Sequence, residues 1–258
     1  MDDAHVTYAV DRLWPDPSAG LSLDAVTERY EPPAARGGRP GVAINMVTSV
    51  DGRAQLNGTA DGLGSRADRL LMRQYRAAFD AVGSGAGTLR ATGIWLRVGD
   101  ALAARREAEG RPRNPMGVVL AGSKPVPTDA KWFDGDEPRL LVVGRDNPMA
   151  QAPAGTELLR APTPKPDPSW VLDQLGERGI RSFLLEGGPH ANAAFLSAGL
   201  VDEILWTVGA LVTGADALAM IAPPAPGAPP PSPRRVRLAA AHRHDGELFL
   251  RYRFDEGG

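Results

Sequence analysis

The sequence contains no cysteine. This absence excludes disulfide bonds, iron–sulfur clusters, thiolate zinc sites and cysteine nucleophiles. There is also no surplus of positive charge, because 29 Lys and Arg residues stand against 31 Asp and Glu residues, for a formal net charge of −2. We therefore expect neither a nucleic-acid partner nor an acidic membrane surface as a partner.

Histidines are few and long apolar runs are missing. None of the four histidines is spaced with carboxylates as a metal-ligand set, so we expect no metal site. No window reaches the roughly 18 consecutive apolar residues of a membrane helix. The N-terminus carries Asp2 and Asp3 and lacks the apolar core of a secretory signal. We expect a cytoplasmic protein.

The remaining composition is that of a globular protein, with 43% hydrophobic and 23% charged residues. Residues 1–40 predict a loosely structured N-terminal arm, and residues 41–258 predict a single domain. In this domain short buried strands alternate with helices, which predicts an α/β fold with a mostly parallel central sheet flanked by helices. Strands are expected at Val42–Thr48, Ala81–Gly83, Met116–Ala121, Leu140–Gly144, Arg181–Leu185 and Ile204–Val208.

Helix and turn signals complete this outline. Ser65–Asp68 fits a capping box that opens a helix, and further helices are expected from Asp167 and from Pro189. Arg235–Ala240 and Glu247–Phe254 alternate in polarity and predict a C-terminal antiparallel hairpin. Seven prolines between Pro223 and Pro233 predict a stiff loop before it.

The strongest chemical feature is the turn Leu184–Pro189, which reads Leu-Leu-Glu-Gly-Gly-Pro. A strand ends, two glycines allow a tight turn, and Pro189 begins a helix where a missing N–H is tolerated. Such a helix N-terminus can hold a phosphate, although an ordinary strand–helix connection would look the same. Glu186 favours function, because a carboxylate at the carboxyl end of a strand faces the crevice in which α/β sheets bind ligands.

A second glycine-rich turn, Gly83–Thr88, also follows a strand. It matches neither the Rossmann pattern, because Thr88 stands at the third glycine position, nor a P-loop, because no Gly-Lys-Ser/Thr follows. Two phosphate-compatible turns at separate strand ends favour a dinucleotide, whose pyrophosphate and ribose need contacts from more than one loop.

Four blocks resemble the reductase domain of the bifunctional deaminase–reductase family of riboflavin biosynthesis, in the same order and with the same spacing. They are residues 43–53, 80–88, 184–189 and 195–203. The resemblance implies a dihydrofolate-reductase-like fold and the NADPH-dependent reduction of 5-amino-6-(5-phosphoribosylamino)uracil to its ribitylamino form. The deaminase signature is absent, so the sequence resembles a stand-alone reductase. Thr92–Arg97 replaces a family Asp-Asp-Pro beside the expected substrate pocket.

The resemblance also implies a set of cofactor contacts around the two turns. Met46, Val47 and Thr48 would flank the nicotinamide, although Met46 and Val47 are equally explained as core. Thr88 would bond the cofactor or cap its helix, and His190 would pack against it. Ser123, with Lys124 and Arg145, would meet the 2′-phosphate that distinguishes NADPH, or serve only as loop residues. The full cofactor set is Met46, Val47, Thr48, Gly83, Gly85, Gly87, Thr88, Ser123, Arg145, Gly187, Gly188, Pro189, His190, Ala191 and Asn192.

Five residues are candidate substrate contacts. Glu186 would bond substrate hydroxyls or cap its own helix, and Arg76 would grip the substrate phosphate or be a surface charge. Arg97 is a second phosphate candidate. Ser65 would touch substrate or simply cap its helix, and Asp51 would be an acid or a turn residue. The sequence identifies no catalytic proton donor.

Two other functions remain open. A pterin or folate reductase would keep the fold and cofactor and change the substrate. An NADPH-binding regulatory protein without turnover would fit the altered segment Thr92–Arg97. We also expect a homodimer formed by joining sheets, with Glu247–Phe254 as the edge strand.

Overall fold

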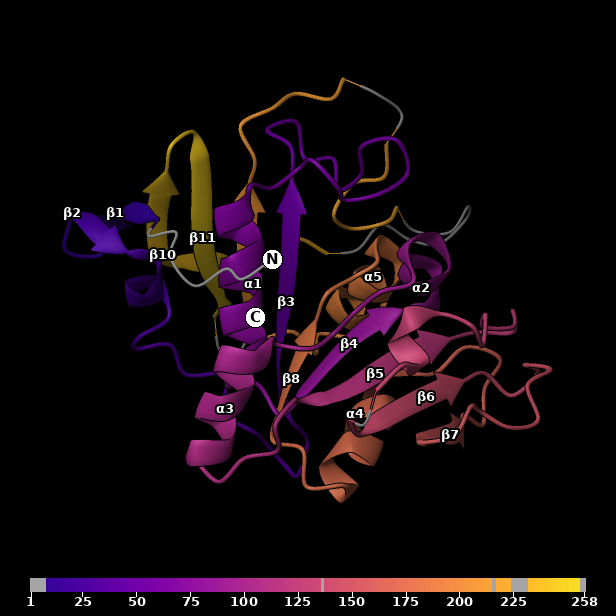
Figure 1. Cartoon of the computed structure of the whole chain (residues 1–258). Coiled ribbons are helices and arrows are strands. Elements are labelled where there is room, and N and C mark those ends of the chain that lie inside the picture. Colours follow the sequence, from indigo (N-terminus) through magenta and orange to yellow (C-terminus); the bar gives the residue numbers. More distant parts are fainter. Residues whose placement is uncertain (1–7, 136, 215–216, 224–231, 256–258) are drawn as a thin grey trace.

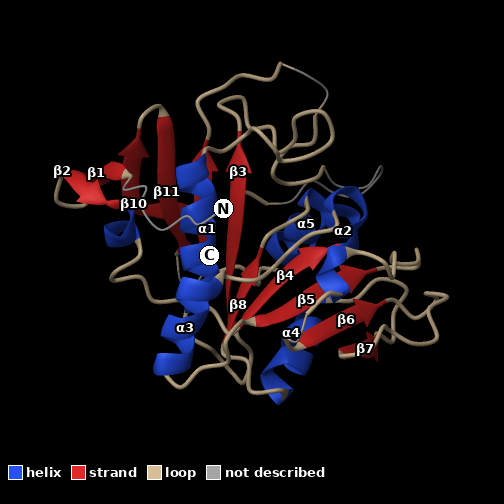
Figure 2. Ribbon diagram, viewed as in Figure 1, coloured by secondary structure: helices blue, strands red, loops and turns tan. Residues whose placement is uncertain are grey.

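The computed structural model describes residues 8–135, 137–214, 217–223 and 232–255. These residues form one 11-stranded sheet in the order β2-β1-β10-β11-β9-β3-β8-β4-β5-β6-β7. Helices cover both faces of the sheet (Figures 1 and 2). The predicted α/β class is confirmed.

The described strands are β1 (Ala9–Trp14), β2 (Ser18–Ser22), β3 (Gly41–Thr48), β4 (Ala81–Gly85), β5 (Met116–Ala121), β6 (Arg139–Val143), β7 (Thr156–Arg160), β8 (Ser182–Leu185), β9 (Glu203–Val208), β10 (Val236–His244) and β11 (Glu247–Phe254). The helices are α1 (Arg66–Ala78), α2 (Ala86–Thr92), α3 (Asp100–Ala108), α4 (Pro168–Glu177) and α5 (Pro189–Ser197), with short 3₁₀ turns at Leu23–Val26 and Lys131–Phe133. The sequence analysis missed α2, α3 and β7.

The strands from β9 to β7 in the sheet order pair in parallel, and the strands from β2 to β9 pair antiparallel. The carboxyl ends of the parallel strands therefore meet at one edge. Within this edge β8 stops early. Leu185 lies opposite Ile44 on β3, whereas β3 continues to Thr48. Because β8 ends before β3 does, this edge has a step at β8. The chain that leaves β8 turns within that step.

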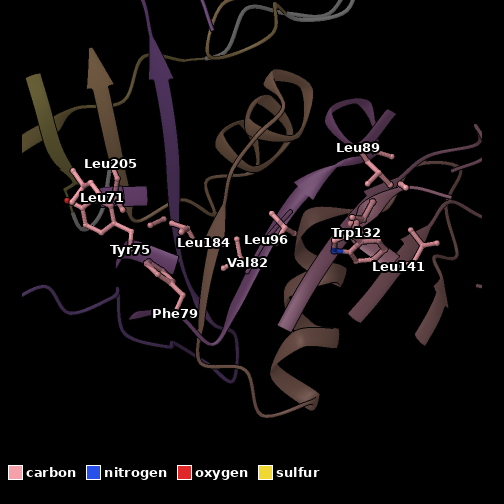
Figure 3. Packing of buried hydrophobic residues seen from close by; sticks show 14 of the residues in the cluster. Leu71, Tyr75, Phe79, Val82, Leu89, Leu96, Trp132, Leu141, Leu184 and Leu205 are labelled. Atoms are coloured by element: carbon pink, nitrogen blue, oxygen red, sulfur yellow. The ribbon is translucent and has the colours of Figure 1, made fainter. Parts of the chain in front are cut away.

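Each face of the sheet has its own hydrophobic core. On the α1 face, Leu71 and Tyr75 of α1 and Phe79 directly after it pack with Leu184 of β8 and Leu205 of β9 (Figure 3). The other face packs against α4 and α5 through a second cluster. Side chains alternate between the faces along each strand, so residues two positions beyond a core residue face the same side.

The expectation of a loosely structured arm is wrong for residues 8–40. β1 pairs with β10, and β2 pairs with β1, so this segment extends the sheet. Val10, Leu23 and Tyr30 are buried in the core, and the Tyr30 hydroxyl donates to Glu203 Oε2 at 2.8 Å. The segment is ordered by two partners. The backbone of β10 pairs with β1, and the buried Glu203 accepts the Tyr30 hydroxyl.

The predicted C-terminal hairpin is confirmed as β10 and β11, but its proposed role as a sheet edge is wrong. β11 lies between β10 and β9, and both of its sides are paired. In the described part of the chain the edges of the sheet are β2 and β7. The homodimer therefore stays a prediction without that edge. Residues 224–231 of the expected proline-rich loop lie outside the described residues.

Candidate active site

The two predicted glycine turns come together at the carboxyl ends of β4 and β8. These strands are neighbours, with Val82 opposite Leu184. The Gly85 N–H donates to the Gly187 carbonyl at 2.7 Å, and the Glu186 N–H donates to the Gly83 carbonyl at 2.8 Å. The two turns therefore form one continuous backbone surface.

Helix α5 begins at this surface, directly after Gly188, without a side-chain cap. Its N-terminal dipole end is oriented as an anion site requires. The glycines are needed here. Gly187 has φ +82°, and a Cβ on it would lie 2.9 Å from Met46 Sδ, while a Cβ on Gly188 would lie 3.1 Å from Thr88 Oγ1. Gly187 thus leaves no room for a side chain, whereas at Gly188 a methyl group would fit only if the Thr88 side chain moved.

We predict that Gly83→Ala lowers the free energy of unfolding by about 1–3 kcal/mol, because overpacking a buried position strains its neighbours. The added methyl would lie 2.4 Å from Cζ of the buried Phe183 ring. The matched change Gly87→Ala places its methyl in open space in α2, and we expect it to leave stability unchanged or raise it by less than about 1 kcal/mol. Urea unfolding measures both variants. Equal stabilities would contradict the packing argument.

The predicted nicotinamide contacts differ in accessibility. Met46 and Val47 are half-buried at the end of β3. Thr48 is fully buried, and its hydroxyl oxygen accepts a hydrogen bond from Trp206 Nε1 at 2.9 Å. The Thr48 side chain therefore holds β3 and β9 together, and its carbonyl also accepts the Gly209 N–H at 2.7 Å, so its contact with the nicotinamide stays a prediction.

On α5, Asn192 is buried and its Nδ2 donates to the Met220 carbonyl at 3.0 Å. Its Oδ1 is buried and has no hydrogen-bond partner among the residues that the structure describes. The Ala191 N–H donates to the Gly188 carbonyl, so it is used within the turn. His190 is exposed.

The three residues predicted to meet a 2′-phosphate lie farther along the same edge. Ser123 and Lys124 are exposed just beyond β5. Arg145 is exposed just beyond β6, and its Nε lies 3.1 Å from Asp146 Oδ1. β5 and β6 are adjacent parallel strands, so these residues belong to neighbouring loops.

On the α1 face, Arg76 and Glu186 form a buried ion pair. Arg76 Nε donates to Oε1 and Nη2 donates to Oε2, both at 2.7 Å, and Nη1 donates to the Arg97 carbonyl at 3.1 Å. Their side chains are 5% and 8% exposed. Arg76 is therefore no surface charge. Its contact with a substrate phosphate, and that of Glu186 with substrate hydroxyls, stay predictions, and both would have to form at the rim of this pair.

The other substrate candidates are engaged elsewhere. Arg97 Nε lies 2.8 Å from Glu137 Oε2. Asp51 accepts the Thr213 and Gly214 N–H groups and the Thr213 hydroxyl, in an exposed turn. A hydrogen bond from Ser49, with the backbone N–H groups of Thr213 and Gly214, holds the pKa of Asp51 well below its usual range. These contacts favour its turn role, and its role as an acid stays a prediction.

Ser65 caps α1, as its alternative role predicts. Its hydroxyl oxygen accepts the Ala67 N–H at 3.0 Å, and the hydroxyl donates to Glu247 Oε2 at 2.5 Å. The sequence analysis missed both Glu247 and Glu137. Each is brought to its partner by tertiary folding, and neither stands in a local motif that could have identified it.

A cleft of about 740 Å³ opens at the other end of the parallel strands, near the start of β9. It mixes arginines with acidic side chains and contains none of the predicted site residues. In the described ranges no three His, Asp or Glu residues gather as a metal site. No helix of that part is both long and apolar enough to cross a membrane.

The fold is that of an α/β protein whose two glycine turns meet at the carboxyl ends of its parallel strands, the end at which open α/β sheets bind ligands. Residues 40–244 match the family model described as the RibD C-terminal domain. The chain belongs to the RibD C-terminal domain family, and the resemblance predicted from four sequence blocks is confirmed.

Three similar proteins illustrate the relationship. Riboflavin biosynthesis protein RibD of Mycobacterium tuberculosis is 32% identical over 182 residues, which are 69% of this chain and 44% of that protein. The chain thus spans less than half of the length of that relative. The 2,5-diamino-6-ribosylamino-4(3H)-pyrimidinone 5′-phosphate reductase of Archaeoglobus fulgidus is 28% identical and is matched over 83% of its length and 68% of this chain. Acinetobacter baumannii RibD, a solved structure, superposes with a TM-score of 0.70 at 25% identity, covering 85% of this chain and 59% of that one. The chain therefore shares the fold of that RibD structure.

Proposed function

We propose that this chain is an NADPH-dependent reductase of a ribosylaminopyrimidine 5′-phosphate, converting 5-amino-6-(5-phosphoribosylamino)uracil to its ribitylamino form. The carrying observation is the single backbone surface made by the two glycine turns, at the stepped edge beside the Arg76–Glu186 pair. Family membership supports the same reaction class.

The residues present fit a nicotinamide nucleotide. The turn is bare of side chains at Gly187 and Gly188, so backbone can approach a pyrophosphate closely. The buried Asn192 Oδ1, which has no partner among the described residues, is an acceptor suited to a hydroxyl or amide N–H of the nucleotide and not to its phosphates. We assign the pyrophosphate to residues 187–192 and Thr88, and the 2′-phosphate to Ser123, Lys124 and Arg145. When bound, such a cofactor supplies a hydride.

The protein's own contribution is mainly positioning. Arg76 fixes the orientation of the Glu186 carboxylate through two hydrogen bonds, so that this acid is preorganised where β8 ends. The half-buried Met46 and Val47 provide an apolar wall at the end of β3. The sugar of the substrate would open to an imine in this crevice, with its hydroxyls facing Glu186.

The test is turnover by purified protein. With NADPH and 5-amino-6-(5-phosphoribosylamino)uracil we expect loss of NADPH absorbance and formation of the ribitylamino product. A parallel assay uses the 2,5-diamino pyrimidinone named for the Archaeoglobus fulgidus relative. Turnover of that compound alone would change the substrate. Tight NADPH binding without turnover of either would favour a regulatory protein, and competition by methotrexate would favour a pterin reductase.

Gly188→Ala tests the cofactor assignment separately. The added methyl lies against Thr88 Oγ1, a side chain that can rotate, and φ at this position suits alanine. We expect the Kd for NADPH to rise at least about tenfold, equivalent to about 1.4 kcal/mol, while the unfolding free energy changes by less than about 1 kcal/mol. Calorimetric titration and urea unfolding measure the two quantities. An unchanged Kd would remove the pyrophosphate from this turn.

A further inference from the structure

The first turn of α1 carries a carboxyl group that its expected structural role does not explain. In a capping box the side chain of Asp68 would accept the backbone N–H of Ser65. Here Glu247 takes that place, because its Oε1 accepts the Ser65 N–H at 2.6 Å and its Oε2 accepts the Ser65 hydroxyl at 2.5 Å. The Asp68 carboxyl is thereby released from capping.

The released carboxyl group lies near the Thr207 hydroxyl on β9, which acts to lower the pKa of this carboxyl. Thr207 lies opposite Val47 of β3 and two residues beyond Leu205, which faces α1 (Figure 3). Thr207 therefore faces α1 as well. The carboxyl group also packs directly on Gly64, where a Cβ would lie 2.2 Å from Asp68 Oδ2. Its position is thus defined from two sides.

Glu186 reaches the same face from the other side of β3. It stands two residues beyond Leu184, whose side chain packs against α1, and Arg76 of α1 binds it. The sheet order is β9-β3-β8, so Asp68 with Thr207 and Glu186 flank β3 on one face. This is the wall to which the substrate is assigned above.

The charges around Asp68 favour its protonated form. Burial, together with the carboxylates of Glu247 and Glu186, raises the pKa of Asp68 to about 6, against the opposing influence of the Thr207 hydroxyl and Arg69. A carboxyl group with such a pKa can hold a proton near neutral pH and release it during a reaction.

We propose that Asp68 contacts the nitrogen that joins the pyrimidine to the sugar and supplies the proton consumed in the reduction. This inference rests on the proposed function. Hydride from the reduced nicotinamide forms the C–H bond at the imine carbon, while the C=N π pair takes the Asp68 proton and forms N–H. The nicotinamide leaves oxidised, Asp68 is left as a carboxylate, and water reprotonates it.

The first experiment compares pH profiles of kcat/KM. For the wild type we expect kcat/KM to fall as the pH rises through about 6, because the protonated acid is required. For Asp68→Asn we expect at least a tenfold lower kcat at pH about 6 and loss of that fall. Gly64→Ala, which displaces the carboxyl group without removing it, should change the profile in the same direction. Asp100→Asn removes a first-turn acid from α3 and should leave the profile unchanged. A wild-type rate and profile in Asp68→Asn would overturn the proposal.

The second experiment needs no turnover. In protein labelled with ¹³C at aspartate carboxyl groups, the resonance absent from Asp68→Asn should titrate near pH 6 and move on addition of the ribitylamino product. Because the folded protein holds this proton more tightly than the unfolded chain, the wild type should also lose stability relative to Asp68→Asn as the pH rises through about 6. A resonance that titrates near its ordinary value of 3.8 or ignores the pyrimidine would overturn the proposal. An inactive wild type whose Asp68 still responds to the pyrimidine would instead count against the reductase reaction alone.

Discussion

Arg76→Ala is expected to lower the free energy of unfolding by about 3–5 kcal/mol and to abolish measurable reductase activity. The reason is the environment of its partner. Glu186 is 8% exposed, and both of its carboxylate oxygens accept hydrogen bonds from Arg76. Without Arg76 the carboxylate is a buried charge without its counter-ion, which is the costly way to break such a pair. Urea unfolding at neutral pH measures the loss.

Two further variants separate the causes. Arg145→Ala removes an arginine from an exposed ion pair with Asp146, so we expect a change of no more than about 1 kcal/mol. The double variant Arg76→Met with Glu186→Met removes both charges, and should recover most of the lost stability while remaining inactive. If Arg76→Ala proved as mild as Arg145→Ala, the pair would be hydrated and its role in fixing Glu186 would fail.

Glu203→Ala is expected to have an effect of similar size, about 3–5 kcal/mol, on unfolding. Glu203 is fully buried at the start of β9. It accepts hydrogen bonds from the Tyr30 hydroxyl and from Nε of both Arg251 and Arg253 on β11. Its removal leaves two arginines facing each other without a counter-charge and frees the tyrosine hydroxyl, whose pKa is now held well above its ordinary range by burial and this carboxylate.

The Glu203 variant should also release the N-terminal segment. We expect trypsin to cleave at Arg36 and Arg39 faster than in the wild type under native conditions. Asp173→Ala is the matched control, since Asp173 also binds an arginine, Arg39, but the side chains of this pair are 37% and 45% exposed and the pair should matter by less than about 1 kcal/mol. For this control cleavage is compared at Arg36, because the substitution itself releases Arg39. Unchanged cleavage in Glu203→Ala would show that Tyr30 does not anchor the segment.

The parts of the site that consist of residues adjacent in the sequence were predictable. The turn Leu184–Pro189 was identified because strand, glycines and helix-starting proline follow one another, and the structure joins it to the second turn through Gly85 and Gly187. The Arg76–Glu186 pair was not predictable, since its partners are 110 residues apart and each has an ordinary explanation on its own.

The capping box of α1 shows a different limit. The sequence correctly places the helix start at Ser65, and the natural reading of Asp68 is as the second half of the box. Folding brings Glu247 across 182 residues to bind Ser65, and so changes what Asp68 is available for. The prediction of a loosely structured N-terminal arm failed for the same reason. The order of this segment depends on β10, and its Asp11 binds Arg243, which is 232 positions away.

The separation of 232 positions between Asp11 and Arg243 has a consequence for how the chain folds during synthesis. β1 and β2 are translated before the other described strands of the sheet, whereas the partner of Asp11 on β10 follows 232 positions later, so the N-terminal strands must wait for β10. Throughout that interval the apolar Val10 and Leu23 are without their final surroundings. Such long-range pairing slows folding and prolongs exposure to aggregation. Yield during expression should therefore depend on chaperone supply and temperature more than the stability of the finished protein would suggest.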